Sequence, residues 1–157
     1  MFKVGAIDGV VIKRLKRHTD ARGWLMETFR SDEAGAAVSH VMTYLSLTRP
    51  GVARGPHEHI HQTDYFAFAG PSNFKVYLWD RRPSSPTYNN MMTEVAGEDS
   101  PAVVIVPPGV VHAYKNVGGN DGLVVNSPDR LFMGAGKKEP VDEVRYENDP
   151  DSPYRLD

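Results

Sequence analysis

The amino-acid sequence predicts an all-β fold, an antiparallel sandwich or barrel, because short apolar runs alternate with turn residues along the chain. Fourteen glycines and twelve prolines interrupt its 157 residues. Between them lie runs rich in β-branched and aromatic side chains, which favour strands. Many short strands separated by such turns are typical of β-sandwiches and barrels. The runs cover residues 10–12, 25–29, 41–47, 65–68, 74–79, 103–106, 112–117 and 123–125.

The chain has the length of one domain, residues 1–157, and is long enough to bury a hydrophobic core. One or two short helices at most are expected, and the best candidate covers residues 32–37, with Ser31 as its N-cap. From about Lys137 onward, charged residues and prolines dominate the sequence. Residues 137–157 are therefore expected to form an irregular tail that lies over the barrel.

Composition excludes several classes of function. The net charge of −2 at pH 7 gives no basis for nucleic-acid binding. No segment approaches the roughly eighteen uninterrupted apolar residues of a membrane span, so no membrane association is expected. Cysteine is absent, which excludes disulfides and a thiolate nucleophile or ligand. The N-terminal residues lack the apolar core of a signal peptide, and a cytoplasmic protein is expected.

Three of the six histidines lie within five residues, at positions 57, 59 and 61. Side chains two positions apart on a β-strand point to the same face, so His57 and His59 would share one face. A bend after them would return the chain and place Asp64 opposite. His112 would enter the same site from another strand, whose start is fixed by the turn residues Pro107-Pro108-Gly109. Imidazoles gathered in this way can bind a metal ion, or can hold a substrate and move its protons.

The set His57, His59, Asp64 and His112 contains the ligand types of a metal site. Three neutral imidazoles and one carboxylate suit Fe, Mn, Ni, Co or Zn and leave one coordination position open. The same residues could transfer protons without a metal, with Asp64 orienting His57 or His59. The residues alone leave both interpretations open.

Two further side chains are expected beside these histidines. Alternation along the strand would bring Tyr114 and Asn116 to the same wall as His112. His112 and Asn116 are therefore candidate substrate ligands. Tyr114 and His59 are candidate proton donors.

The spacing of these residues resembles the two signature motifs of the cupin superfamily. Cupins are proteins built as small jelly-roll β-barrels (double-stranded β-helices). Asp64 stands where the first motif usually has Glu, and the last glycine gap of that motif is one residue short. The resemblance implies a cupin-type jelly-roll β-barrel with the histidines inside. The matching positions are Gly51, His57, His59, Asp64 and Gly70, followed by Pro107, Gly109, His112 and Asn116.

Four further segments, taken in order, resemble the dTDP-4-dehydrorhamnose 3,5-epimerase family, a cupin branch that acts on nucleotide-linked 4-keto-6-deoxy sugars. The first, residues 20–29, has the form D-x-R-G-aromatic-x-x-E-x-F. The others are residues 51–57, 80–88 and 106–114. The likeness extends over roughly residues 8 to 132. It implies an epimerase that removes a proton next to the ketone of a dTDP-linked sugar, with no cofactor required.

The resemblance also implies roles for single residues. His57 matches the catalytic base of the family, and a neutral imidazole suits this task near pH 7. Arg54 and Arg22 match arginines that contact the diphosphate, because their fork-shaped cations suit phosphate oxygens. Trp24 and Glu27 match an aromatic residue and an acid near the nucleotide. In the family, the N-terminal strands, about residues 1–30 here, are exchanged with a partner subunit, so a homodimer is expected.

The chain departs from the family at two positions and leaves alternatives open. Asp64 stands where the family has a lysine, and Val125 where a tyrosine acts as proton donor. Residues 54–59 also resemble the R-G-x-H-x-H motif of sugar-nucleotide 3,4-ketoisomerases. A metal-dependent cupin of another reaction class, such as a dioxygenase, metal-assisted isomerase or decarboxylase, is a second alternative. A non-catalytic sugar-nucleotide binder is a third, since two expected catalytic residues are missing.

Overall fold

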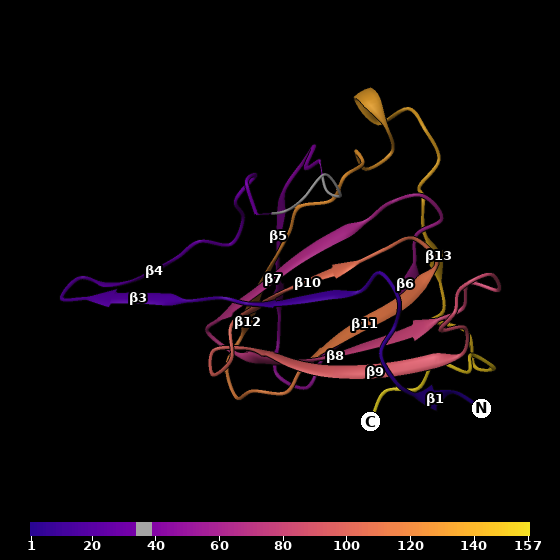
Figure 1. Ribbon diagram of the computed structural model, residues 1–157, viewed down its shortest axis with the longest axis horizontal. Helices are drawn as coiled ribbons and strands as arrows, with labels where there is room; N and C mark the ends of the chain where they lie inside the picture. The colour runs from indigo at the N-terminus through magenta and orange to yellow at the C-terminus, as the bar shows by residue number, and fades with distance from the viewer. Residues whose placement is uncertain (34–38) are drawn as a thin grey trace.

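The computed structural model describes residues 1–33 and 39–157, which form two facing β-sheets and a projecting hairpin (Figure 1). The six-stranded sheet has the order β1 (Lys3–Val4), β9 (Asn90–Gly97), β8 (Asn73–Asp80), β11 (Val110–Asn116), β6 (Ala53–Glu58) and β13 (Val144–Arg145). The five-stranded sheet has the order β2 (Val11–Arg14), β10 (Ala102–Val106), β7 (Asp64–Gly70), β12 (Gly122–Asn126) and β5 (Tyr44–Thr48). All neighbouring strands are antiparallel except β1 and β9. This arrangement confirms the predicted all-β jelly-roll barrel.

The core lies between the two sheets because strand side chains alternate between faces. Along β8, Phe74, Val76 and Leu78 face the five-stranded sheet and are almost completely buried. Tyr77 and Trp79 point to the opposite face of the same strand. Here the C-terminal residues cover them, since Tyr154 packs 5.4 Å from the Trp79 ring.

The outer face of the five-stranded sheet is less well covered. Leu45 and Leu47 on β5 pair in register with Val125 and Leu123 on β12, so these side chains share the outer face. Leu45, Leu47 and Leu123 are exposed, at 67%, 50% and 41%. The edge of this sheet therefore presents apolar side chains to solvent.

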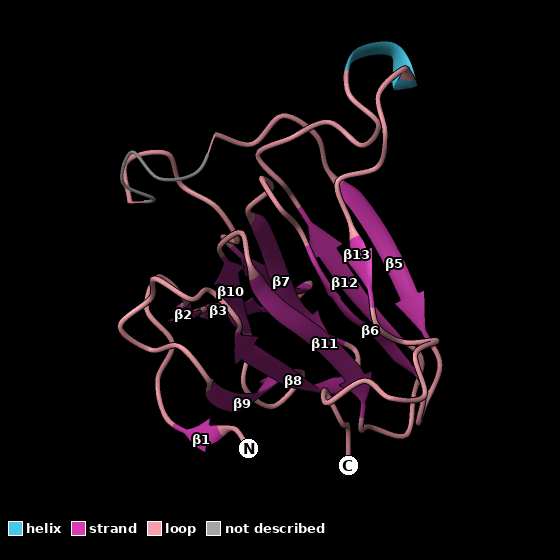
Figure 2. Ribbon diagram, turned by 90° about the vertical axis from the view of Figure 1, so that its right-hand side faces the viewer, coloured by secondary structure: helices cyan, strands magenta, loops and turns pink. Residues whose placement is uncertain are grey.

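The hairpin of β3 (Arg17–Asp20) and β4 (Gly23–Met26) forms a separate two-stranded sheet. It extends away from the barrel as an arm (Figure 1). At the other side of the molecule, the segment after β12 rises above the barrel and carries the 3₁₀ turn η2 (Ala135–Lys137) (Figure 2).

Each of the eight predicted runs overlaps a strand, but other elements were missed. β9 escaped prediction because its sequence, Asn-Met-Met-Thr-Glu-Val-Ala-Gly, has few strand-forming residues. The helix expected over 32–37 falls mainly on residues 34–38, which lie outside the described residues, and Ser31–Glu33 form a turn. The tail expected to be irregular contributes β13, a short strand paired with β6. Among the described residues, no helix is long and apolar enough to cross a membrane.

Candidate active site

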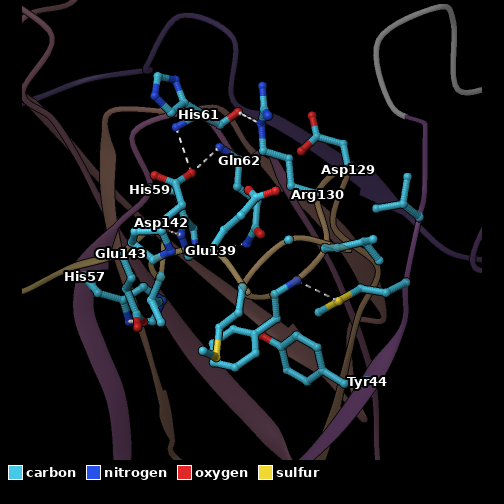
Figure 3. Close-up of a pocket in the computed structure, with 18 of the residues that line it drawn as sticks. Tyr44, His57, His59, His61, Gln62, Asp129, Arg130, Glu139, Asp142 and Glu143 are labelled. Carbon is cyan, nitrogen blue, oxygen red and sulfur yellow. Dashed lines mark hydrogen bonds and ion pairs between the residues drawn. The ribbon is translucent and has the colours of Figure 1, made fainter. Parts of the chain in front are cut away.

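A cavity of 1220 Å³ opens between β5, β6 and the segment from Asp129 to Glu147 (Figure 3). Phe66 and Tyr114 line its inner part, and His57 and His59 line one wall. Charged side chains of both signs also line the cavity, among them Arg130 and Glu143. The predicted histidine strand therefore does face a cavity large enough for a sizeable ligand.

Two neighbouring strands position His57 and His112 side by side. The residues pair in register on β6 and β11, and their ring centroids are 4.5 Å apart. Gly55 has a φ of +81°, and a Cβ atom built there would lie 2.6 Å from the backbone oxygen of His112. Only glycine allows this close approach of the two strands. The turn predicted at Pro107–Gly109 precedes β11, and the Gly109 amide donates to the His59 carbonyl at 2.8 Å.

Asp64 lies beneath the histidines and joins two of them. Its Oδ2 is 3.1 Å from Nε2 of His59 and 3.2 Å from Nε2 of His112. Its Oδ1 accepts hydrogen bonds from Gln62 and Asn126, at 2.9 and 2.8 Å. A buried carboxylate is stable when several donors surround it in this way. The structure thus brings together all four residues of the predicted histidine and carboxylate set.

The environments of the paired histidines shift their pKa values in opposite directions. Burial, together with the neighbouring His112 and His59 rings, lowers the pKa of His57 to about 2. Burial also acts on His59, but the hydrogen bond and charge of Asp64 outweigh it and raise the pKa of His59 to about 9. Despite its burial, Asp64 has a pKa well below its usual value because both histidines contact it. Near neutral pH, His57 is therefore a free base and His59 a proton-bearing acid.

Residues 142–145 supply two acids that sequence reasoning missed. The Asp142 carboxylate accepts from the backbone amides of Ile60, His61 and Gln62, at 2.9–3.0 Å. Its carbonyl oxygen contacts Nδ1 of His59. The Glu143 carboxylate lies 3.7 Å from Nδ1 of His57. No local pattern marks these residues, because only the pairing of β13 with β6 brings them to the histidines.

Other predicted residues differ in their relation to the cavity. The Tyr114 hydroxyl lies 2.9 Å from Oγ of Ser46 at the inner wall. Arg54 lines the cavity, with two of its nitrogens donating to Thr48 and to the Leu47 carbonyl on β5. The prediction for Asn116 as a substrate ligand is wrong. Asn116 is completely buried and its amide is fully used within the protein, since it donates to two backbone carbonyls and accepts from Ser72 and Gly118.

The three predicted nucleotide contacts on the arm lie outside the cavity of their own chain. Arg22 is exposed and paired with Asp20. Trp24 is half exposed under the guanidinium of Arg17, which lies 4.8 Å from the ring centroid. Glu27 pairs with Arg30. These side chains can therefore serve a substrate only in a pocket other than their own.

Two cavity residues were not singled out from the sequence. Arg130 donates through Nε to the His61 carbonyl, and its terminal nitrogens remain at the cavity mouth (Figure 3). Tyr44 reaches into the cavity from β5. No spacing rule links Arg130 or Tyr44 to the histidine motif.

Val125 stands at the position where the family has its tyrosine. It packs near Tyr65 on the outer side of the sheet and does not face the cavity.

The ring nitrogens of His57, His59 and His112 all lie within 4.8 Å of one another, a spacing that a metal ion could bridge. Asp64, however, faces the Nε2 atoms of His59 and His112 at hydrogen-bond distance. Oδ2 of Asp64 and Nε2 of His112 are nevertheless buried without a hydrogen-bond partner among the described residues. A shared proton or a metal ion could satisfy these atoms, so the geometry is compatible with both interpretations.

A jelly-roll of two facing sheets with this histidine cavity defines a cupin. The sequence profile of the dTDP-4-dehydrorhamnose 3,5-epimerase family matches residues 5–126, and the chain belongs to this family. It is similar to the probable low-salt glycan biosynthesis epimerase Agl13 of Haloferax volcanii, with 35% identity over 80% of this chain and 81% of the relative. It is also 35% identical to the spore coat polysaccharide biosynthesis protein SpsL of Bacillus subtilis, over 71% and 73% of the two chains.

Solved structures share the fold. A dTDP sugar isomerase from Desulfovibrio desulfuricans superimposes with a TM-score of 0.79 at 22% identity, covering 92% of this chain and 87% of that chain. RmlC from Streptococcus suis, solved with dTDP-D-xylose, gives a TM-score of 0.70 at 21% identity, covering 80% and 66%. The barrel found here is therefore the barrel of these proteins.

Proposed function

We propose that this chain is an epimerase of a nucleotide-linked 4-keto-6-deoxy sugar, with His57 as the base that removes a proton next to the ketone. The observation that carries the proposal is the position of His57, an imidazole at the wall of a 1220 Å³ cavity with the Glu143 carboxylate 3.7 Å from its Nδ1. The hydrogen to be removed is acidic because the electron pair left behind delocalises onto the ketone oxygen as an enolate. Membership of the epimerase family supports the same reaction.

The surroundings of His57 allow its ring to accept a proton and to release it again. Burial keeps the ring neutral, and the Glu143 carboxylate 3.7 Å away stabilises the positive charge that forms when the ring takes a proton. His59 is the proton-bearing neighbour on the same wall, and donates to the developing oxyanion in this proposal. In this proposal His57 accepts a proton and His59 donates one. The difference arises because Asp64 contacts His59 and does not contact His57.

The cations of the cavity suit a diphosphate. Arg54 and Arg130 line the cavity, and beyond the nitrogens bound to the protein Arg130 keeps two terminal nitrogens and Arg54 keeps one. Guanidinium groups bind phosphate oxygens through parallel hydrogen bonds. A nucleotide-sugar substrate agrees with the dTDP-D-xylose found in the Streptococcus suis relative.

A homodimer with exchanged arms completes the proposal. Arg22 and Trp24 lie on an arm outside their own cavity, and the apolar outer face of the five-stranded sheet offers a contact surface. Subunit mixing tests the exchange. If His57→Asn and Arg22→Ala variants are each inactive, their equimolar mixture should regain about a quarter of wild-type activity, since half of the dimers are mixed and one pocket in each has both residues. An unexchanged dimer would regain none.

The reaction is tested by incubation with dTDP-4-keto-6-deoxyglucose in D₂O, followed by NMR of the sugar. We expect deuterium at a carbon next to the ketone, with inverted configuration. His57→Asn should abolish this incorporation, whereas Tyr88→Phe, at an exposed position outside the cavity, should not. The absence of deuterium from both substrate and product would contradict the proposal, and a 3-keto product would assign the chain to the ketoisomerases.

A metal-dependent reaction is the second candidate, favoured by the close approach of the three histidine rings. Elemental analysis of untagged protein, purified without chelator or nickel resin, distinguishes the two. Near one equivalent of Fe, Mn, Ni, Co or Zn that disappears in His59→Ala would replace proton transfer by metal chemistry. Metal-free protein that turns over would leave His57 as the base.

A further inference from the structure

We infer that Tyr44 is the catalytic acid, which delivers a proton to the face of the sugar opposite His57. The inference rests on the proposed epimerisation and goes beyond it by naming a second catalytic residue. Epimerisation inverts one carbon, so the proton must leave from one face and return to the other. A donor on the wall opposite the base is therefore required by the chemistry itself.

Tyr44 lies on the appropriate wall. It belongs to β5 of the five-stranded sheet, whereas His57 belongs to β6 of the six-stranded sheet, and both line the same cavity. Figure 3 shows the Tyr44 ring directed into the cavity from the side opposite His57. A planar enolate held between the two sheets would present one face to each residue.

The hydrogen bonds of Asn126 fix the direction of the Tyr44 hydroxyl. Its Oδ1 accepts from the backbone amide of Tyr65 at 3.0 Å, which identifies the opposite end of the amide as Nδ2. Nδ2 has two hydrogens and donates one to Asp64, at 2.8 Å, and the other to the Tyr44 oxygen, at 3.0 Å. The Tyr44 oxygen is therefore an acceptor in this contact, and its own hydrogen is left for the cavity.

The second phenol of the cavity is less suited to the task. The Tyr114 hydroxyl is already paired with Ser46, and Tyr114 is only 4% exposed, compared with 44% for Tyr44. Burial raises the pKa of Tyr44 to about 12, so its hydroxyl is protonated near neutral pH. The bond from Asn126 stabilises the phenolate that forms after the proton has been given away.

The complete step balances. The C–H bond breaks as His57 takes the proton, and the electron pair moves onto the ketone oxygen. The pair then returns to carbon as a new C–H bond forms on the opposite face with the Tyr44 proton. The resulting phenolate takes a proton from water, and the His57 imidazolium loses its proton to water.

The decisive experiment is Tyr44→Phe, assayed in D₂O with dTDP-4-keto-6-deoxyglucose. The variant should lose at least 100-fold in inverted product but still wash deuterium into unreacted substrate, because His57 can exchange its proton and return it to the same face. His57→Asn should lose both. Tyr88→Phe, an exposed phenol outside this cavity, makes the same chemical change and should retain both. Circular dichroism and thermal melting check that each variant is folded.

The outcomes separate this inference from the proposed function. If Tyr44→Phe inverts the sugar at the wild-type rate, or Tyr114→Phe alone shows the split between exchange and inversion, Tyr44 is not the acid although the epimerase stands. If Tyr44→Phe loses exchange and inversion equally while folded, its role is in binding and the inference is overturned. If the wild-type protein neither exchanges nor inverts, the proposed function fails together with it.

Discussion

Gly55 provides a sharp test of how the fold positions His57, because Gly51 offers a matched control. Both glycines have left-handed backbone angles, with φ of +81° and +75°. An alanine at either position costs about 1–2 kcal/mol for the strained backbone. At Gly51, a Cβ atom meets nothing within 4 Å. At Gly55, it would lie 2.6 Å from the His112 oxygen and 3.1 Å from Nδ1 of His57, which adds about 1–3 kcal/mol for overpacking.

Urea unfolding at fixed pH measures this difference. Gly55→Ala should be less stable than Gly51→Ala by about 1–3 kcal/mol, which corresponds to roughly 3–10 °C in Tm. Turnover should fall steeply only in Gly55→Ala, since β6 must move away from β11 and carries His57 with it. Equal stabilities would refute the clash, and full activity in Gly55→Ala would refute the claim that this glycine positions the base.

Three further outcomes are expected. His59 has a pKa raised to about 9, so it stabilises the folded protein fully below pH 6.5 and this contribution is lost as the pH rises towards 9. In the wild type, the urea concentration at the unfolding midpoint should fall between pH 6.5 and 9, and Asp64→Asn should make this fall smaller. A fall of the same size in both proteins would contradict the pairing of His59 with Asp64. Arg130→Ala should raise KM about tenfold or more with little change in kcat, as expected for loss of a charge-assisted phosphate contact; a loss confined to kcat would contradict this role. Leu47→Lys combined with Leu123→Lys should halve the mass seen by sedimentation at an unchanged circular dichroism spectrum, whereas a dimer that survives would exclude this face as the interface.

Local patterns were sufficient for most of the barrel. The alternation in β8 predicted a strand, and the Pro-Pro-Gly turn correctly marked the start of β11. His57 and His59 could be paired from their spacing alone, because a strand repeats every two residues. The same rule failed for Asn116, because the cavity ends at Tyr114 and the next position is closed by Ser72.

The missed site residues share one property, which is that tertiary pairing alone brings them to the cavity. Glu143 reaches His57 only because the two-residue strand β13 pairs with β6. Tyr44 is linked to the histidines through Asn126, a residue 82 positions later in the chain. Neither contact leaves a spacing that could be recognised, since each depends on which strands become neighbours. Sequence motifs therefore predicted the candidate base, whereas the acids beside it became visible only in the structure.

The two departures from the family motif lie in, or directly beside, one hydrogen-bond network. Asp64, at the position of the family lysine, does not stand alone as a reversed charge, because His59 and His112 both contact it and Gln62 and Asn126 satisfy its other oxygen. Asn126, next to the position where the tyrosine was missing, extends the same network to Tyr44. Asp64 and Tyr44 are thus joined through Asn126 in one hydrogen-bonded chain. This coupling predicts that Asp64→Lys alone would disrupt the site rather than improve it, since the buried Gln62 and Asn126 amides would lose their acceptor. A tyrosine at position 125 would project from the outer face of the sheet and would not reach the cavity.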